Sequence, residues 1–392
     1  MDGCAPTSQG TGTKPRSIWH MEDIFYELIL VALGLRKSLS RNPSDQEWRW
    51  LFHICQKQAI VAFAFPALDQ LNRAEQKVPA NLVYEWLAQS EHVKAQNELM
   101  NLEAARLTKL FEDEGHRTAI LKGQANARLY PQPWSRQPGD IDIWVDGGKD
   151  KVIETVRRLG LLKGEIAKFM VDGDLTLTYH HIHLPKNENG VDVEVHFRPS
   201  SGNMNPYTNR RLQRFLKTEI NRGNVLTPEG FRVPSLRFAL VMQLAHIQRH
   251  LVSEGVGMRQ IIDYYYLLKS DVSCQRKDVS PLLKSFGLNH MAEALMWVLH
   301  EKLMLEEEYL IAPLDERRGK MLLRQIMEGG NFGHYHPDKQ HGLKQRIMAK
   351  NKHRIQMFRF DFCEAFWMEL KYFTFILKTI PARIKRRKWS LE

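Results

Sequence analysis

The stretch that decides the fold class of this chain reads Gly139-Asp140-Ile141-Asp142-Ile143-Trp144-Val145. Acidic and apolar side chains alternate along it, and this period of two is typical of a strand with one polar and one buried face. We expect Asp140 and Asp142 to lie side by side, with the aliphatic residues in a core. Two adjacent carboxylates repel each other unless a cation lies between them, so the strand predicts a cation site. The alternative is a solvated acidic edge.

A second acidic strand follows at Val191-Asp192-Val193-Glu194-Val195-His196-Phe197. The same alternation puts Asp192, Glu194 and His196 on one face. If the two strands are neighbours, Glu194 joins the aspartate pair as a third carboxylate, with Asp192 as the substitute for that role. Three acids can hold two divalent ions about 3.5–4 Å apart. Mg²⁺ and Mn²⁺ are hard ions that prefer such oxygens and keep coordination places for phosphate.

The segment before the first acidic strand has the features of a phosphate-binding turn. Residues 118–121 are strand-like, and Lys122-Gly123-Gln124 then leads into a short helix. Glycine lets backbone amides approach a phosphate, and a helix N-terminus favours an anion. Lys122 is expected to pair with phosphate or with the acids, and Arg136 is a second candidate phosphate partner. The alternatives are an ordinary strand–Gly–helix connection and a surface salt bridge.

The chain around these motifs shows helical spacing of apolar residues over 18–39, 48–71 and 83–114, and strand-like alternation over 175–183. Strand, helix, strand, helix and hairpin make a small α/β unit. We therefore expect five parts: a disordered polar leader over 1–17, a helical N-terminal region over 18–115, the α/β core over 116–205, a helical C-terminal domain over 206–340, and a basic aromatic tail over 341–392.

Composition limits the class of protein. The four cysteines are far apart and form no CxxC pair, which argues against a disulfide framework or a structural zinc site and favours a reducing compartment such as the cytoplasm. The sequence contains no run of 18 apolar residues, so it predicts no membrane span. The net charge is +11, and the tail alone has 13 Lys and Arg against 4 Asp and Glu, so the body is nearly neutral.

The tail interleaves basic and aromatic side chains and ends in Arg383-Ile384-Lys385-Arg386-Arg387-Lys388. Three interpretations remain open. It packs its aromatics on the body as a terminal helix, or it lies on an anionic membrane surface at the inner face of the membrane, or it binds RNA through phosphate attraction and base stacking.

Two helices downstream pair polar side chains at a spacing of four, which places them on one helix face. His246 and His250 form one pair, and Arg259 and Asp263 form the other. One interpretation is a second wall of an active cleft, and the other is a buried polar network that ties the helices together. Glutamate is absent between the histidines, so a HExxH zinc site is excluded. The candidates for the second wall are Asp192, His196, His246, His250, Arg259 and Asp263.

These motifs together resemble the nucleotidyltransferase superfamily that includes polymerase beta. That pattern is a Gly-containing turn opening a helix, an Asp-x-Asp/Glu strand and a third acid on a later strand. The resemblance is closer to a family of uncharacterised bacterial nucleotidyltransferases and covers residues 118–198, with a looser extension to the two downstream helices. The stretches that carry it are Leu121-Lys122-Gly123, Tyr130-Pro131, Arg136, Asp140-Ile141-Asp142 and Glu194-Val195-His196-Phe197.

The resemblance implies an α+β fold with an α/β-like core, in which a nucleotidyltransferase-type mixed sheet is flanked by N-terminal and C-terminal helical regions. It implies that Asp140, Asp142 and Glu194 are catalytic ligands of Mg²⁺ or Mn²⁺. The nucleotide-binding positions are then Lys122, Gly123, Gln124 and Arg136. The family's usual Gly-Gly or Gly-Ser turn is here Gly123-Gln124.

The expected activity is the transfer of a nucleoside monophosphate, for example from ATP, to an acceptor hydroxyl that Glu194 helps to deprotonate. The acceptor is not identified by the sequence, and a small molecule or glycan precursor fits the near-neutral body better than RNA. The alternative is a catalytically degenerate module that binds a nucleotide or contacts a membrane peripherally through the tail. The departure at Gln124 motivates that alternative.

Overall fold

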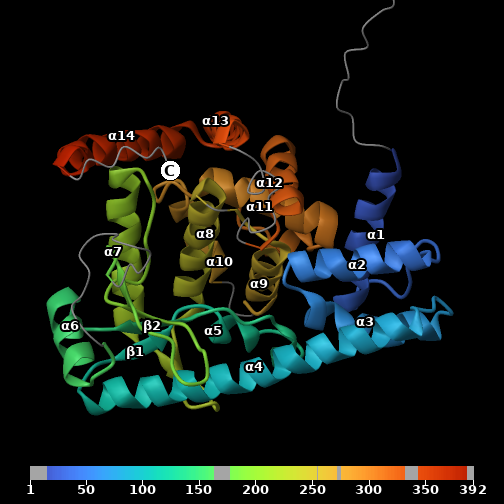
Figure 1. Cartoon of the computed structure of the whole chain (residues 1–392), viewed down its shortest axis with the longest axis horizontal. Helices are drawn as coiled ribbons and strands as arrows, with labels where there is room; N and C mark the ends of the chain where they lie inside the picture. Colours follow the sequence, from blue (N-terminus) through green and yellow to red (C-terminus); the bar gives the residue numbers. More distant parts are fainter. Residues whose placement is uncertain (1–15, 163–176, 254, 272–274, 332–342, 386–392) are drawn as a thin grey trace, which may run out of the picture.

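The computed structural model describes residues 16–162, 177–253, 255–271, 275–331 and 343–385 (Figure 1). The predicted leader falls almost entirely outside these ranges. The helices are α1 Arg16–Ala32, α2 Asp45–Lys57, α3 Val61–Arg73, α4 Ala80–Asp113, α5 Gln124–Ala127, α6 Lys149–Arg158, α7 Pro206–Arg222, α8 Leu236–Ser253, α9 Met258–Lys269, α10 Arg276–Val279, α11 Asn289–Leu303, α12 Glu316–Gly329, α13 Leu343–Phe360 and α14 Phe362–Lys385. The strands are β1 Thr118–Ile120, β2 Ile141–Val145, β3 His181–His183, β4 Val193–His196, β5 Val225–Leu226 and β6 Arg232–Val233.

Four of the strands form a mixed sheet with the order β1-β2-β4-β3. The β1–β2 and β3–β4 pairs are antiparallel, whereas β2 and β4 are parallel and in register. Helical segments precede and follow this sheet in the chain. The predicted α+β class, a mixed sheet flanked by helical regions, is therefore confirmed.

The sheet separates two apolar layers. On one face, Ile143 and Val195 pack in a core that also contains Leu107 of α4 and Val156 of α6. Trp144 points to the opposite face and joins the larger core of the helical regions. Figure 1 shows α4 on one side of β1 and β2, with α7, α8 and α9 on the other. The period-two alternation of the strand thus assigns its aliphatic side chains to one layer, as predicted.

The strand predicted over 175–183 is shorter than expected, and its first two residues lie outside the described ranges. The chain reverses at Thr178, whose amide donates to the carbonyl of His181 at 2.9 Å, and Leu177 bridges to Ile182. The Thr178 hydroxyl accepts the amides of His180 at 3.3 Å and His181 at 3.1 Å. A side chain that binds nearby backbone amides competes with a sheet ladder, which explains the turn.

The basic tail folds as two helices with different surroundings. Met357 and Phe360 near the end of α13 are buried in the larger core. Phe362, Phe366 and Phe373 of α14 are exposed, the first by 65%. The packed-helix interpretation therefore describes the end of α13 and the first turns of α14, where Ala365 joins the same core, whereas much of the α14 aromatic surface has no cover within the described residues. None of the described helices is long and apolar enough to cross a membrane.

Candidate functional site

The two acidic strands meet as the alternation requires. Asp142 of β2 is the register partner of Glu194 of β4, and both lie on the face opposite the smaller core. Three possible ligand atoms lie within 4.8 Å of one another: a carboxylate oxygen of Asp142, a carboxylate oxygen of Glu194 and a ring nitrogen of His196. Asp192 instead pairs with Lys186 at 3.1 Å near the end of the hairpin turn. The structure therefore brings Glu194, rather than Asp192, to the aspartates.

Lys122 follows β1 and lies between the two aspartates. Its Nζ is 3.2 Å from Oδ1 of Asp140 and 2.7 Å from Oδ2 of Asp142. Burial alone would lower the pKa of Lys122, but Asp140, Asp142 and Glu194 together raise it, so the side chain is an ammonium. Oδ2 of Asp142 is within ion-pair distance but has no well-aligned hydrogen bond among the described residues. The expected pairing of Lys122 with the acids is what the structure shows.

His196 supplies a second positive charge. Its Nε2 donates to Oδ1 of Asp142 at 3.0 Å and to Oε2 of Glu194 at 3.2 Å, while Nδ1 lies 3.2 Å from the carbonyl of Arg198. Burial would lower the pKa of His196, but the two carboxylates raise it to about 9. Burial and the neighbouring Asp140 raise the pKa of Asp142. Three carboxylates face two cationic side chains, so the site remains short of positive charge and favours a further cation.

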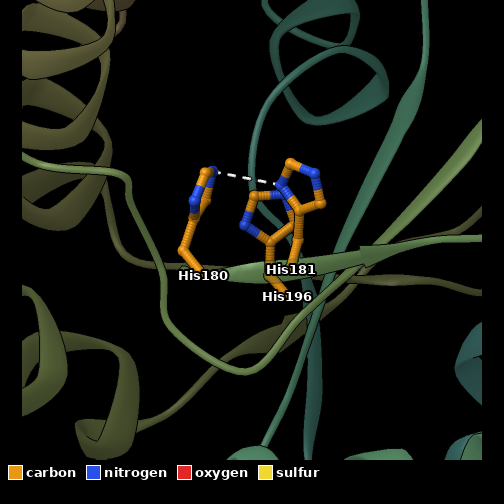
Figure 2. A group of neighbouring side chains, drawn as sticks. All are labelled: His180, His181 and His196. Atoms are coloured by element: carbon orange, nitrogen blue, oxygen red, sulfur yellow. Dashed lines mark hydrogen bonds between the residues drawn. The ribbon is translucent and has the colours of Figure 1, made fainter. Parts of the chain in front are cut away.

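Histidines that the sequence analysis did not single out surround the outer side of Glu194. His181 Nδ1 lies 3.1 Å from Oε2 of Glu194, and His183 Nδ1 lies 3.6 Å from Oε1. His180 joins them from the turn, with Nε2 3.1 Å from His181 Nδ1 (Figure 2). Burial lowers the pKa of His180 to about 2 and that of His181 to about 4. The His-His-x-His spacing at 180–183 was the available signal, because His181 and His183 share a strand face.

A narrow pocket lies beside Lys122, between the sheet and helices α8 and α9. Its lining residues are Lys122, Gly123, Asn126, Arg136, Gly139, Asp140, Gln243, His246, Arg259, Gln260 and Asp263. The free volume is about 20 Å³, room for roughly one water-sized group. A larger cavity of about 450 Å³ lies around Tyr26 and Arg41, far along the chain from these acids. The pocket by Lys122 is therefore far smaller than a triphosphate in this structure.

The downstream helices contribute both to this pocket and to a buried network. His246 lines the pocket, and its ring centroid is 4.2 Å from that of His250 on the same helix. Asp263 accepts two hydrogen bonds from the Arg136 guanidinium, both 2.8 Å long, and one of 2.7 Å from the Tyr130 hydroxyl. The network interpretation is supported for Asp263, with Arg136 rather than a histidine as its main partner.

The same network holds the loop that leads into β2. Arg259 of α9 donates from Nη1 to the carbonyls of Gln137 at 3.0 Å and Pro138 at 3.2 Å. Arg136, on that loop, is buried against Asp263. The loop ends at Asp140, so α9 fixes the backbone position from which this carboxylate reaches the site. Arg136 thus has a structural partner, although it also lines the pocket.

The glycine turn is present, but the helix after it is only one turn long. Gly123 has φ of 62° and ψ of −107°, a conformation that side chains rarely adopt, and an added Cβ would lie 3.4 Å from the Asp140 carbonyl. Because α5 has four residues, its dipole contributes little to anion binding. The Gln124 side chain donates to Asn101 of α4 at 2.7 Å, so it ties the turn to α4 rather than entering the pocket.

Comparison with known proteins adds one match. The model of a protein family described as uncharacterised nucleotidyltransferase matches residues 44–303. The matched region contains the whole four-stranded sheet, the acid cluster and the helices α8 and α9. No curated protein matches the chain.

Proposed function

The chain belongs to this uncharacterised nucleotidyltransferase family, and we propose that it transfers a nucleoside monophosphate from a nucleoside triphosphate to an acceptor hydroxyl with Mg²⁺ or Mn²⁺. The observation that carries the proposal is the in-register pairing of β2 and β4, which sets Asp142 beside Glu194 on one face. Asp140 lies on the same side of the site, linked to Asp142 through Lys122.

The donor set fits a hard divalent cation. Asp140, Asp142 and Glu194 would hold it through carboxylate oxygens, the ligands that Mg²⁺ prefers. The buried Oδ2 of Asp142 has the Lys122 ammonium 2.7 Å away but no aligned hydrogen bond among the described residues, so an ion at this oxygen would compete with Lys122. When bound, the ion would supply charge neutralisation and polarisation at the transferring phosphate.

The cationic side chains of the pocket would balance the negative charge of the phosphates that the metal ion leaves uncompensated. Lys122 lines the pocket and also contacts Asp142, and Arg259 lines the same pocket from α9. A triphosphate carries several negative charges, so these two side chains favour its phosphate end over its base. Since α5 is short, side chains rather than a helix dipole carry this role.

The chemistry is an in-line substitution at the α-phosphorus. A bond forms between the acceptor oxygen and this phosphorus, the bond to the β-phosphate oxygen breaks, and pyrophosphate and the acceptor proton leave. Burial would raise the pKa of Glu194, but hydrogen bonds from His183 and His196 hold it well below its usual range. Glu194 is therefore a weak base, which supports a role as metal ligand more than one in deprotonating the acceptor.

A second candidate function is a degenerate module that binds nucleotide without transfer. Two observations favour it: Lys122 already forms ion pairs with both aspartates, and the pocket beside it is small. Nucleotide binding that is independent of Mg²⁺, with no pyrophosphate release from any acceptor pool, would select this function.

The exposed surface of α14 is the basis of our proposal for the acceptor. Phe362, Phe366 and Phe373 are exposed along a helix whose chain continues into a cluster of basic residues. Aromatic side chains beside Lys and Arg suit the headgroup region of an anionic membrane. We therefore favour a small-molecule or lipid-linked glycan precursor over RNA as acceptor, with peripheral contact at the inner face of a membrane in the cytoplasm.

The decisive experiment measures pyrophosphate release from labelled nucleoside triphosphates and Mg²⁺, with cell-extract fractions as acceptors. Wild-type protein should release pyrophosphate with at least one fraction, and Asp142→Asn should reduce the rate by at least about a hundredfold, as expected for loss of a group that stabilises charge in the transition state. Asp146→Asn is the matched control, because Asp146 follows the same strand but pairs with Arg117. Equal rates for wild type and Asp142→Asn would reject the assignment.

A further inference from the structure

We propose that His180, His181 and His196 form a separate site for a divalent transition-metal ion, of which Zn²⁺ fits best. One ring nitrogen of each histidine lies within 4.8 Å of the others. Figure 2 shows the three rings gathered from the turn, from β3 and from β4. This inference does not rest on nucleotidyl transfer, because imidazole nitrogen rather than carboxylate oxygen defines the site.

The turn at Thr178 creates the arrangement. In a straight strand, His180 and His181 would point to opposite faces. The Thr178 hydroxyl accepts both of their amides, and the resulting turn brings His180 Nε2 within 3.1 Å of His181 Nδ1. His196 faces them from β4, where it is the register partner of His181.

The distances match those between ligands of one ion. Zn²⁺ binds nitrogen at about 2.0–2.1 Å in tetrahedral sites, which places neighbouring ligand atoms about 3.3 Å apart. The His180–His181 separation is 3.1 Å, and Oε2 of Glu194 lies 3.1 Å from His181 Nδ1. Glu194 therefore borders the site beside His181, and the three imidazoles leave the fourth position of a tetrahedral Zn²⁺ for a water molecule.

The three imidazole rings of the cluster lie close to one another. The ring centroid of His181 lies 4.3 Å from that of His180 and 5.0 Å from that of His196. Both ring nitrogens of His196 have hydrogen-bond partners, and His180 Nδ1 lies 3.4 Å from the Thr178 hydroxyl, so an ion would replace part of an existing hydrogen-bond network. A metal ion accepts the lone pairs of deprotonated ring nitrogens. His196 would release one ring proton to solvent on binding, as metal ligands do.

The site differs in ligand class from the proposed Mg²⁺ site. Mg²⁺ selects oxygen ligands, whereas imidazole suits Zn²⁺ and Co²⁺. Asp140 and Lys122 line the pocket beside the carboxylates and are not members of the histidine cluster. Glu194 borders both sites, so an ion at the histidines would also fix the orientation of the carboxylate beside Asp142.

The test is a titration of the full-length, metal-free protein with Co²⁺ and Zn²⁺. We expect the visible absorption bands of tetrahedral Co²⁺, their displacement by one equivalent of Zn²⁺, and at least about a tenfold weaker Zn²⁺ affinity for His180→Asn and for His181→Asn. The asparagine variants keep a polar side chain, and circular dichroism without metal verifies their fold. The readout is spectroscopic and independent of enzymatic activity.

Background sites need two controls. His53→Asn removes an exposed histidine outside the cluster, and the triple variant His334→Ala/His336→Ala/His341→Ala removes histidines of the segment 332–342. Both should keep the tetrahedral spectrum. Unchanged Zn²⁺ affinity in folded His180→Asn and His181→Asn, or octahedral Co²⁺ bands only, would overturn the proposal.

One further variant separates this site from the proposed activity. Asp140→Asn should abolish nucleotidyl transfer and leave the Co²⁺ spectrum intact, because Asp140 is not a ligand of the histidine cluster. Loss of the tetrahedral spectrum in Asp140→Asn would contradict two separate sites. Tetrahedral Co²⁺ in a protein that shows no transfer would support the histidine site while rejecting the function.

Discussion

The ammonium nitrogen of Lys122 lies 2.7 Å from Oδ2 of the buried Asp142, so a positive charge of the chain itself is built into the acid cluster. Lys122 also reaches Asp140 at 3.2 Å. A divalent ion between the aspartates would compete for the same oxygens. The stability of the site and its affinity for metal are therefore linked through one side chain.

Replacing Lys122 should make the fold depend on divalent metal. Lys122→Met leaves buried carboxylates without their partner, which we expect to lower the free energy of unfolding by about 3–5 kcal/mol in EDTA. Added Mg²⁺ should restore more stability to this variant than to wild type. Urea unfolding with and without Mg²⁺ measures both effects.

The control for this prediction is Lys186→Met. Lys186 pairs with Asp192 at 3.1 Å on the surface, where an ion pair contributes at most about 1 kcal/mol. Equal losses for Lys122→Met and Lys186→Met in EDTA would show that Lys122 does not neutralise the cluster.

The Arg136–Asp263 pair should be essential for stability. Both side chains are buried and share two hydrogen bonds of 2.8 Å, so Arg136→Ala should cost about 3–5 kcal/mol by leaving Asp263 uncompensated. The pair Arg128–Glu229 is more exposed and should cost about 1 kcal/mol or less when Arg128 is replaced. A double-mutant cycle with Asp263→Asn measures the coupling, and strict additivity would be inconsistent with the network.

Asp263 should also make stability sensitive to acid. Burial alone would raise its pKa, but the Arg136 guanidinium holds it below its ordinary value of 3.8. Because the pKa is depressed on folding, the contribution is present above the unfolded pKa and is lost as the pH falls through the folded pKa. The difference in unfolding free energy between wild type and Asp263→Asn should therefore shrink below about pH 4. Urea unfolding between pH 7 and pH 3 tests this, and a constant difference would contradict it.

The exposed aromatics of α14 should determine binding to anionic vesicles. Phe366→Glu/Phe373→Glu places carboxylates on the surface proposed to contact lipid and should weaken sedimentation with phosphatidylserine-containing vesicles by at least about tenfold. Tyr84→Glu on α4 is the matched control, since Tyr84 is 72% exposed but lies on another helix. Vesicle binding that is equally strong in all three proteins, or absent in wild type, would reject the membrane proposal. Sedimentation of the wild-type protein without vesicles would show self-association through α14 instead.

Local sequence patterns were sufficient for much of the fold. The long helix expected over 83–114 is α4, which ends at Asp113 before Gly115 in a positive-φ conformation. The alternation over 140–145 correctly assigned the aliphatic residues to a core and the acids to the opposite face. Both patterns depend on short-range geometry, with a period of 3.6 for a helix and two for a strand.

Pairing between distant strands was not available from the sequence. Asp192 and Glu194 follow the same alternation, and only the register between β2 and β4 sets Glu194 opposite Asp142 while Asp192 pairs with Lys186. A shift of register changes every cross-strand neighbour, and register is fixed by packing and hydrogen bonds across the whole sheet. The partner of Arg136 was likewise not predictable, because Asp263 lies on α9, far along the chain.

The sequence by itself thus determined which side chains share a face, because the direction of a side chain follows from the backbone period of its own element. The tertiary structure alone decided which of those faces meet. It placed Lys122 between the aspartates, turned His180 toward His181 and His196, and buried Arg136 against α9. Such contacts join residues far apart in the chain, and only the packing of the complete sheet and its helices selects them.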